Sequence, residues 1–160
     1  MDIVIDKPAR LSAYALHRIV EQHQQGNPAL WADEGAQLRI RPQDAEVPAY
    51  PQGHLLAFAV IACVALRDGR KHRYLPVSDW RGRRVWFEKE ASKHGFQVIG
   101  VHVKGTMQKV ETHDGRRFAL DATEFTGLLR ITDSQAFAQC LRKGIGRVGK
   151  AFGLGMLIVR

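Results

Sequence analysis

A glycine-rich segment close to the end of the sequence restricts the folds that the chain can adopt. Residues 144–156 have the sequence GIGRVGKAFGLGM, with five glycines and two cations. They contain the G-x-G-x-x-G pattern of dinucleotide-binding folds, which requires a preceding strand, a following helix and an acidic residue about 20 positions later. Here the pattern follows a predicted helix and precedes the last predicted strand, and no acidic residue follows Gly149. A P-loop is also excluded, because Lys150 is followed by alanine instead of serine or threonine.

Two interpretations of the segment remain. The first is a helix that stops at Gly144, followed by a tight loop whose glycines meet special backbone angles. The second is a flexible loop whose backbone lies against a nucleic acid strand, with Arg147 and Lys150 in contact with the phosphates of that strand. A helix stop explains Gly144 well and the other four glycines poorly, so we expect the second.

The charge of the chain favours a polyanionic partner. Lysine and arginine number 24 against 16 aspartates and glutamates, a formal net charge of +8 over 160 residues. An excess of this size in a small domain is typical of nucleic acid binding, although a generally basic surface has the same composition.

Cys63 and Cys140 lie among apolar residues, as reduced core thiols do. The start of the sequence does not have the pattern of a signal peptide, and the run Leu55–Leu66 is too short to span a bilayer. We therefore expect a cytoplasmic protein without a membrane partner.

Periodicity and turn residues predict an α+β fold. The predicted helices are residues 12–25, capped by Ser12, residues 79–94, capped by Asp79, and residues 133–143, capped by Asp133. The predicted strands are residues 1–5, one or two within 30–41, a buried central strand from 55, 96–103, 125–131 and 156–159, with a hairpin at 107–120 around Asp114-Gly115. This order favours tandem ferredoxin-like, RNA-recognition-motif-like units, the N-terminal one reduced, with a C-terminal glycine-rich loop. The predicted domains are 1–50 and 54–160, joined by a proline-containing linker at 45–53.

The first predicted helix carries a histidine and a tyrosine on its polar face. Tyr14, His17, Arg18 and Glu21 fall on one face, opposite an apolar face. RNA supplies its own nucleophile, the 2′-hydroxyl beside the scissile phosphate, and histidine can accept or donate a proton at neutral pH. An amphipathic helix with an incidental histidine and tyrosine is the alternative interpretation. The remaining histidines do not have zinc-site spacing with each other or with the cysteines.

Three stretches together resemble the CasE family, the CRISPR-associated endoribonucleases that cut precursor CRISPR RNA in type I-E systems. The first is Tyr14-Ala-Leu-His-Arg18. The second is Arg84-Val-Trp-Phe-Glu-Lys-Glu, followed by His94-Gly-Phe. The third and most specific combines Thr126-Gly-Leu-Leu-Arg-Ile-Thr-Asp with Gly144-Ile-Gly and Lys150-Ala-Phe-Gly-Leu-Gly-Met-Leu. The resemblance covers most of residues 1–25 and 55–160.

The resemblance implies a catalytic helix in the N-terminal domain. It implies that His17 is a general acid or base and that Tyr14 is its hydroxyl partner, which orients the 2′-oxygen; which of them moves which proton stays open. Arg18 is placed to stabilise charge on the phosphorane-like transition state. The implied reaction needs neither metal nor small-molecule cofactor and yields a 2′,3′-cyclic phosphate and a 5′-hydroxyl. The implied partners are the CRISPR repeat hairpin, the crRNA product and other subunits of a surveillance complex such as Cascade.

Basic clusters and the glycine-rich segment are the candidates for RNA contact. An A-form stem hides its bases, so we expect recognition through shape and phosphates. The predicted RNA-binding residues are Arg70, Lys71, Arg73, Arg81, Arg83, Arg84, Arg116, Arg117, Arg142, Lys143, Gly144, Gly146, Arg147, Lys150, Gly153 and Gly155. Each cluster is also compatible with a solvated helix face or turn. A non-catalytic module that binds RNA hairpins on the same fold is the alternative function, and an enzyme that binds a small nucleotide is a more distant one.

Overall fold

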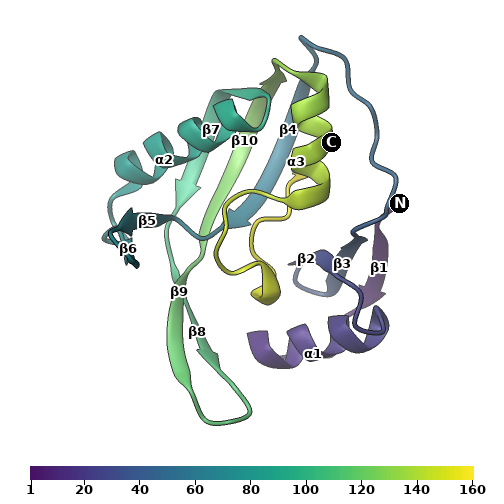
Figure 1. Ribbon diagram of the computed structural model, residues 1–160, viewed down its shortest axis with the longest axis vertical. Helices are drawn as coiled ribbons and strands as arrows, with labels where there is room; N and C mark the ends of the chain where they lie inside the picture. The colour runs from purple at the N-terminus through teal and green to yellow at the C-terminus, as the bar shows by residue number, and fades with distance from the viewer.

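The computed structural model describes residues 1–160 and contains three α-helices and eleven strands (Figure 1). The first elements are β1 (Ile3–Asp6), α1 (Ala13–His23), β2 (Ala29–Asp33) and β3 (Gln37–Pro42). They are followed by β4 (Leu55–Ala62), β5 (Ala65–Asp68), β6 (Lys71–Tyr74), α2 (Trp80–Lys93) and β7 (Phe96–Lys104). The last are β8 (Met107–Glu111), β9 (Arg117–Asp121), β10 (Thr123–Ile131), α3 (Ser134–Lys143), the 3-10 turn η1 (Lys150–Phe152) and β11 (Ile158–Val159). The predicted α+β class is confirmed, and none of the helices is long and apolar enough to cross a membrane.

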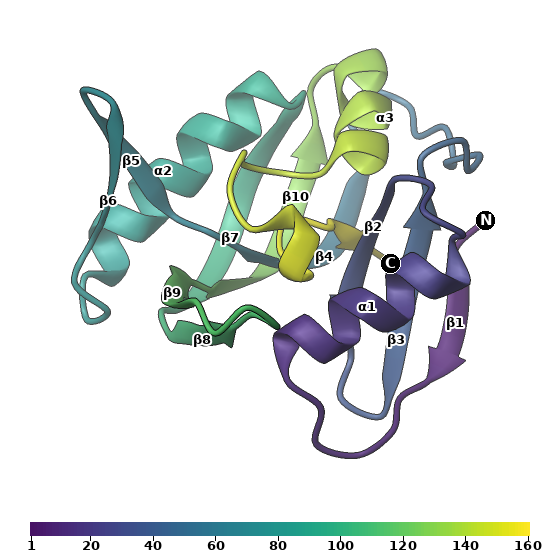
Figure 2. The ribbon, with the colours of Figure 1, turned by 60° about the horizontal axis from the view of Figure 1, so that its bottom comes forward.

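The N-terminal elements form a three-stranded antiparallel sheet with α1 packed across it (Figure 2). The strand order is β1-β3-β2. The helix begins where the sequence predicts, because the Ala15 backbone N–H donates a hydrogen bond of 3.1 Å to Ser12 Oγ. The buried residues of this small core are Leu16, Val20, Trp31, Leu38 and Ile40. The opposite face of α1, which carries Tyr14 and His17, is therefore directed away from this core.

The C-terminal half contains a four-stranded antiparallel sheet in the order β11-β4-β10-β7. The aliphatic run that starts at Leu55 forms β4, which is a central strand as predicted. Helices α2 and α3 cover one face of the sheet (Figures 1 and 2), and the rings of Phe87 and Phe125 stack between α2 and the sheet with centroids 4.3 Å apart. Asp79 and Asp133 cap the two helices as predicted. Residues 43–54 form neither helix nor strand, and the division into domains at this point stays a prediction.

Two hairpins extend from the C-terminal sheet, and both turn at an Asp-Gly pair (Figure 1). The β8–β9 hairpin confirms the prediction around Asp114-Gly115. The β5–β6 hairpin holds most of the basic tract that begins at Arg70.

Both cysteines are free and buried, and burial raises the pKa of the Cys63 thiol to about 11. Cys63 is therefore a protonated core thiol, as the sequence indicates.

The glycine-rich segment folds back onto the molecule beside α1 and β2 (Figure 2). Ile145 N donates a hydrogen bond of 2.7 Å to Gly155 O, and Gly155 N donates one of 2.6 Å to Ile61 O. These bonds close the segment on itself and attach it to β4. All five of its glycines have positive φ, so its path depends on backbone angles that other residues rarely adopt.

Gly153 and Gly155 are buried, so the prediction that they contact RNA is wrong. Gly153 lies against the ring of Trp31, where a Cβ would come within 2.7 Å of a ring carbon. The Trp31 indole donates a hydrogen bond of 3.3 Å to Ala151 O. These two glycines allow close packing within the chain instead of a surface for a ligand.

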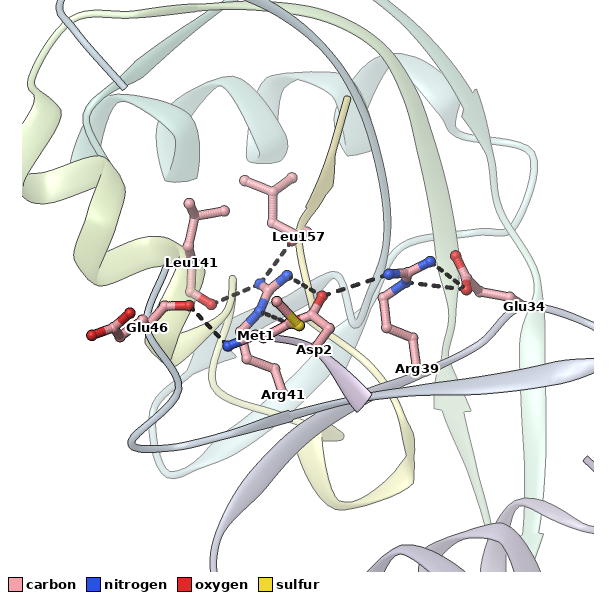
Figure 3. A network of polar contacts seen from close by, with 8 residues as sticks. All are labelled: Met1, Asp2, Glu34, Arg39, Arg41, Glu46, Leu141 and Leu157. Atoms are coloured by element: carbon pink, nitrogen blue, oxygen red, sulfur yellow. Dashed lines mark hydrogen bonds and ion pairs between the residues drawn. The ribbon is translucent and has the colours of Figure 1, made fainter. Parts of the chain in front are cut away.

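A buried arginine joins the N-terminal sheet to the end of the chain (Figure 3). Arg41 on β3 is only 8% exposed. Its Nη1 donates hydrogen bonds to Leu141 O at 2.9 Å and to Leu157 O at 3.1 Å, while Nε and Nη2 donate to the Asp2 carboxylate at 2.7 and 2.8 Å. Every nitrogen of the guanidinium is thus bonded, which offsets the cost of burying its charge.

The first residues of the chain are held in the same network (Figure 3). The amino group of Met1 donates a hydrogen bond of 3.2 Å to Glu46 O. Arg39 lies 3.8 Å from Asp2 and 3.0 Å from Glu34. The network thereby connects β1 and β3 with the segment that leads to β4.

A second arginine is fully buried inside the C-terminal half, and it corrects one prediction. Arg83 on α2 pairs with Asp121 and with Thr123 Oγ1, and its Nη2 donates to Leu75 O at 2.9 Å and Pro76 O at 3.1 Å. Because Arg83 has no exposed surface, the prediction that it contacts RNA is wrong. Its charge fixes α2 to the β9–β10 connection.

Substitution of this arginine tests its structural role. Arg83→Met leaves Asp121 buried without its cation, and we expect the free energy of unfolding to fall by about 3–5 kcal/mol. Arg84→Met is the matched control, because the adjacent Arg84 pairs with Glu88 at the surface, where such pairs contribute less than about 1 kcal/mol. Urea denaturation followed by circular dichroism measures both changes. Equal losses in the two variants would contradict the role assigned to Arg83.

Two glycine variants separate backbone strain from packing in the glycine-rich segment. Gly153 and Gly35 both have positive φ, +79° and +87°, but a Cβ at Gly35 meets no atom within 4 Å. We expect Gly35→Ala to lose about 1–2 kcal/mol of unfolding free energy, the cost of a left-handed backbone. Gly153→Ala should lose about 1–3 kcal/mol more, because the Trp31 ring must also move. Thermal and urea unfolding measure the difference, and its absence would show that Trp31 does not restrict Gly153.

Candidate active site and basic groove

The face of α1 opposite the N-terminal core carries the three residues predicted to be catalytic, and Tyr14 packs there against a second core cluster. Tyr14 and His17 are partly buried, and Arg18 is exposed. Arg18 Nη1 donates a hydrogen bond of 2.6 Å to Glu21 Oε2, and the other carboxylate oxygen of Glu21 lies 3.7 Å from His17 Nε2. The helix therefore brings an acid–base group, a phenol and a cation together, with one carboxylate beside them.

His17 lies between Tyr14 and the glycine-rich segment. Its ring centroid is 6.3 Å from that of Tyr14 and 5.8 Å from that of Phe152 in η1. The His17 side chain keeps 25% of its surface exposed, so a substrate can reach it. Sequence reasoning assigned no role to Phe152, although this residue lies in the glycine-rich stretch that resembles CasE.

A groove rich in cations lies on another side of the same segment. Its volume is about 790 Å³, and its walls come from the β5–β6 hairpin, α2, the end of α3 and the start of the glycine-rich segment. We call it the basic groove. The lysines and arginines that line it are Arg67, Arg70, Lys71, Lys89, Lys93, Lys143, Arg147 and Lys150. This density of positive charge on a concave surface attracts a phosphate backbone.

Glu90 is the single acidic residue of the basic groove. Its carboxylate lies 3.7 Å from His94 Nε2 and accepts a hydrogen bond of 2.6 Å from Lys93 Nζ, and these two neighbours, His94 first, lower the pKa of the carboxyl to about 2. Glu90 is therefore ionised at neutral pH, and it forms an ion pair with Lys93, which lines the same groove. Its negative charge cancels only a small part of the groove's positive charge.

Lys150 connects the basic groove to the site on α1. Its Nζ donates a hydrogen bond of 2.5 Å to Lys143 O at the end of α3, and burial lowers its pKa. Two residues further along the chain, Phe152 contacts His17. The groove and the catalytic candidates therefore share one short segment.

The basic groove contains part of the predicted RNA-binding set. Seven predicted residues line it, namely Arg70, Lys71, Lys143, Gly144, Gly146, Arg147 and Lys150. Gly144 is itself buried, so the other six offer surface to a ligand. Sequence reasoning missed four others, Arg67, Lys89, Lys93 and His94. Lys89 and Lys93, later on the same helix as the predicted Arg81 and Arg84, were missed because a helix face with mixed charges is usually a solvated surface.

Other predicted cations lie outside the groove. Arg116 and Arg117 are exposed on the β8–β9 hairpin, where they pair with Asp114 at 3.0 Å and Glu111 at 3.1 Å. The remaining predicted cations outside the groove are Arg73, Arg81, Arg84 and Arg142, of which all but the partly buried Arg142 are exposed. Their contact with RNA stays a prediction.

No group of three or more His, Cys, Asp or Glu residues is arranged to hold a metal ion.

The fold is similar to that of several solved CRISPR proteins. Cse3 of Thermus thermophilus, bound to an RNA representing a pre-cleavage complex, is 20% identical with a TM-score of 0.77, and the match covers 99% of this chain and 97% of that chain. The CRISPR-associated protein Cas6e of Escherichia coli K-12 is 21% identical with a TM-score of 0.73, over 98% and 96% of the two chains. A chain of a CRISPR RNA-guided surveillance complex is 20% identical with a TM-score of 0.72, over 99% and 97%. At these identities the likeness establishes the fold.

Sequence comparison supplies the family. Among proteins with curated functions, none matches this sequence. The family model described as "CRISPR associated protein" matches residues 14–160, a range that includes the candidate catalytic helix, the basic groove and the glycine-rich segment. The chain therefore belongs to this family of CRISPR-associated proteins.

Proposed function

We propose that this protein is a metal-independent endoribonuclease that cuts CRISPR repeat hairpins in precursor crRNA and then retains the crRNA as a subunit of a surveillance complex. The observation that carries the proposal is the contact of His17 with Phe152, 5.8 Å between ring centroids. This contact places an acid–base group next to the segment that also lines the basic groove. The Cse3-like fold supports the proposed RNA cleavage, since the similar Cse3 of Thermus thermophilus is bound to an RNA representing a pre-cleavage complex.

The proposed reaction uses the 2′-hydroxyl of the nucleotide before the scissile phosphate. The 2′-oxygen attacks phosphorus, the bond to the 5′-oxygen of the next nucleotide breaks, and the products are a 2′,3′-cyclic phosphate and a 5′-hydroxyl. His17 transfers one of the two protons involved, and the Tyr14 hydroxyl orients the 2′-oxygen. Arg18 stabilises charge on the phosphorane-like transition state, which requires it to exchange its bond with Glu21 for one with phosphate.

The basic groove is the proposed site for the RNA backbone. Its eight lysines and arginines face a single carboxylate, so phosphates are its natural ligands. Contacts to phosphates and sugars recognise an A-form stem by shape, because the bases are hidden in the deep major groove. A stem held there and a scissile phosphate at His17 would lie against neighbouring parts of the glycine-rich segment, residues 144–150 in the groove and Phe152 at His17.

The arrangement of strands supports two ferredoxin-like units. The elements β4, α2, β7, β10, α3 and β11 follow the order β-α-β-β-α-β of such a unit. The N-terminal elements have only the order β-α-β-β, which corresponds to a reduced unit. We propose that the reduced unit supplies the catalytic helix and that the complete unit supplies most of the RNA-binding surface.

The catalytic role of His17 is tested with a hairpin RNA that carries the cognate CRISPR repeat, in buffer with EDTA. We expect the wild type to cut the RNA and His17→Ala to cut it about 10²- to 10⁴-fold more slowly, because proton transfer by a positioned side chain contributes that much. Binding of the RNA should stay within a few-fold of wild type. The product ends are identified by mass spectrometry, and a 2′,3′-cyclic phosphate is expected.

His23→Ala is the matched control, because His23 ends the same helix and is exposed. It should cut at the wild-type rate. Tight binding without cutting by the wild type would reject the enzyme and leave the alternative, a non-catalytic module that binds RNA hairpins. Cutting that survives in His17→Ala would place the chemistry elsewhere.

The salt dependence of binding tests the basic groove. The logarithm of affinity should fall linearly with the logarithm of salt concentration, by roughly 0.7–0.9 for each neutralised phosphate. Arg147→Gln removes an exposed cation from the groove, and we expect the slope to decrease by about one. Arg130→Gln, on β10 outside the groove, should leave the slope unchanged. A wild-type affinity that does not vary with salt would rule out phosphate binding in the groove.

A further inference from the structure

Three rings from three separate elements form a row at the edge of the candidate active site. His17 on α1 contacts Phe152 in the glycine-rich segment, and Phe152 in turn lies 5.6 Å from Phe118 on β9, measured between ring centroids. Phe152 is partly buried and is a neighbour of both other rings. Phe118 ends the row and is 38% exposed. It is therefore the phenylalanine of the row that has surface free for a ligand.

The β8–β9 hairpin explains why Phe118 lies at this position. Side chains alternate along a strand, so Phe118 and Leu120 lie on the same face of β9. Val110, which pairs with Phe118 across the hairpin, is on that face too. Leu120 and Val110 are buried in a core cluster, whereas the cover over Phe118 is incomplete. The ring thus contacts the molecule on one side and solvent on the other.

The surroundings of Phe118 favour a nucleic acid ligand. Arg116 and Arg117 immediately precede it on the hairpin and are exposed, and each pairs only with an exposed carboxylate, Asp114 or Glu111. Arg117 lies on the opposite face of β9 from Phe118, so Arg116 is the cation nearer the ring. Cations beside an exposed aromatic ring are the combination that proteins use for single-stranded nucleic acid, where the cation contacts phosphate and the ring stacks on a base.

We propose that Phe118 stacks on the base of an unpaired nucleotide next to the scissile phosphate. This inference rests on the proposed function, because it takes His17 as the residue that acts on that phosphate. A base within an A-form stem is already stacked on both sides, whereas bases in single strands and at ends are free to stack on aromatic side chains. Only one ring separates Phe118 from His17, so the nucleotide it holds lies close to the reacting phosphate.

Stacking on Phe118 positions the strand without selecting a base. A phenylalanine ring has no hydrogen-bond donor or acceptor, and every base offers a π-face. The contact therefore fixes where the single strand leaves the stem, and it tolerates changes of sequence at that position. Discrimination between RNAs is left to the shape of the stem.

The experiment uses the His17→Ala protein, which keeps the RNA intact, and hairpins with 2-aminopurine at the unpaired nucleotide on either side of the stem. Phe118→Leu removes the aromatic ring and retains an apolar contact with Phe152. We expect it to reduce the quenching of 2-aminopurine at one flank and to weaken binding of the flanked hairpin about 5- to 150-fold. Binding of a hairpin without flanks should stay unchanged. Ile99→Ala, which shortens an exposed apolar side chain on β7, is the control and should behave as the parent protein.

A second comparison tests whether the ring and the base act on each other. An RNA with an abasic site at the sensitive flank should bind more weakly to the parent protein, and Phe118→Leu should add no further loss. Unchanged quenching and affinity in Phe118→Leu would overturn the proposal. Equal loss with the flanked and unflanked hairpins would also overturn it, since the ring would then cap the terminal base pair. These readouts concern binding, so they stay valid even if the wild type does not cut RNA.

Discussion

The geometry of the candidate site depends on the buried Arg41. This side chain links β3 of the N-terminal sheet to the last turn of α3 and to the strand that ends the chain, through Leu141 O and Leu157 O. The glycine-rich segment lies between those two carbonyl groups in the sequence. Arg41 therefore holds both ends of the segment against the sheet on which α1 rests. A neutral side chain of similar size cannot donate to two carbonyls and a carboxylate together.

Local patterns predicted most of the fold. The aspartates at positions 79 and 133 and Ser12 precede apolar periodic stretches, and each one caps a helix because its side chain accepts from a free backbone N–H. Asp114-Gly115 marks a turn because glycine takes positive φ without strain. Such signals act within a few residues, so they can be read without knowledge of the rest of the chain. The resemblance to CasE also led to the correct family.

The site could be predicted only in part, because it is built from contacts between distant residues. Nothing local distinguishes Arg83, which is buried beside Asp121, from Arg84, which is exposed on the next position of the helix. The partnership of His17 and Phe152 spans most of the chain and has no sequence spacing that indicates it. Helical periodicity predicted that Tyr14, His17 and Arg18 share one face of α1, and the resemblance to CasE implied their catalytic roles. The groove required the packing of two helices and a hairpin.

The candidate site depends on the last strand, β11, which is short and is held to the sheet by few backbone pairs. β11 pairs with β4 through Ile158 and Val159 alone, and backbone hydrogen bonds of 3.0 Å between Ala57 and Arg160 extend that pairing by one step. Opening of this short strand would loosen the glycine-rich segment, and so the support behind His17 and one wall of the basic groove at the same time. A ligand that binds in the groove stabilises the closed form by mass action. Occupancy of the groove and the order of the residues around His17 would therefore be thermodynamically linked, and an RNA bound in the groove as proposed would contribute to the assembly of the site that acts on it.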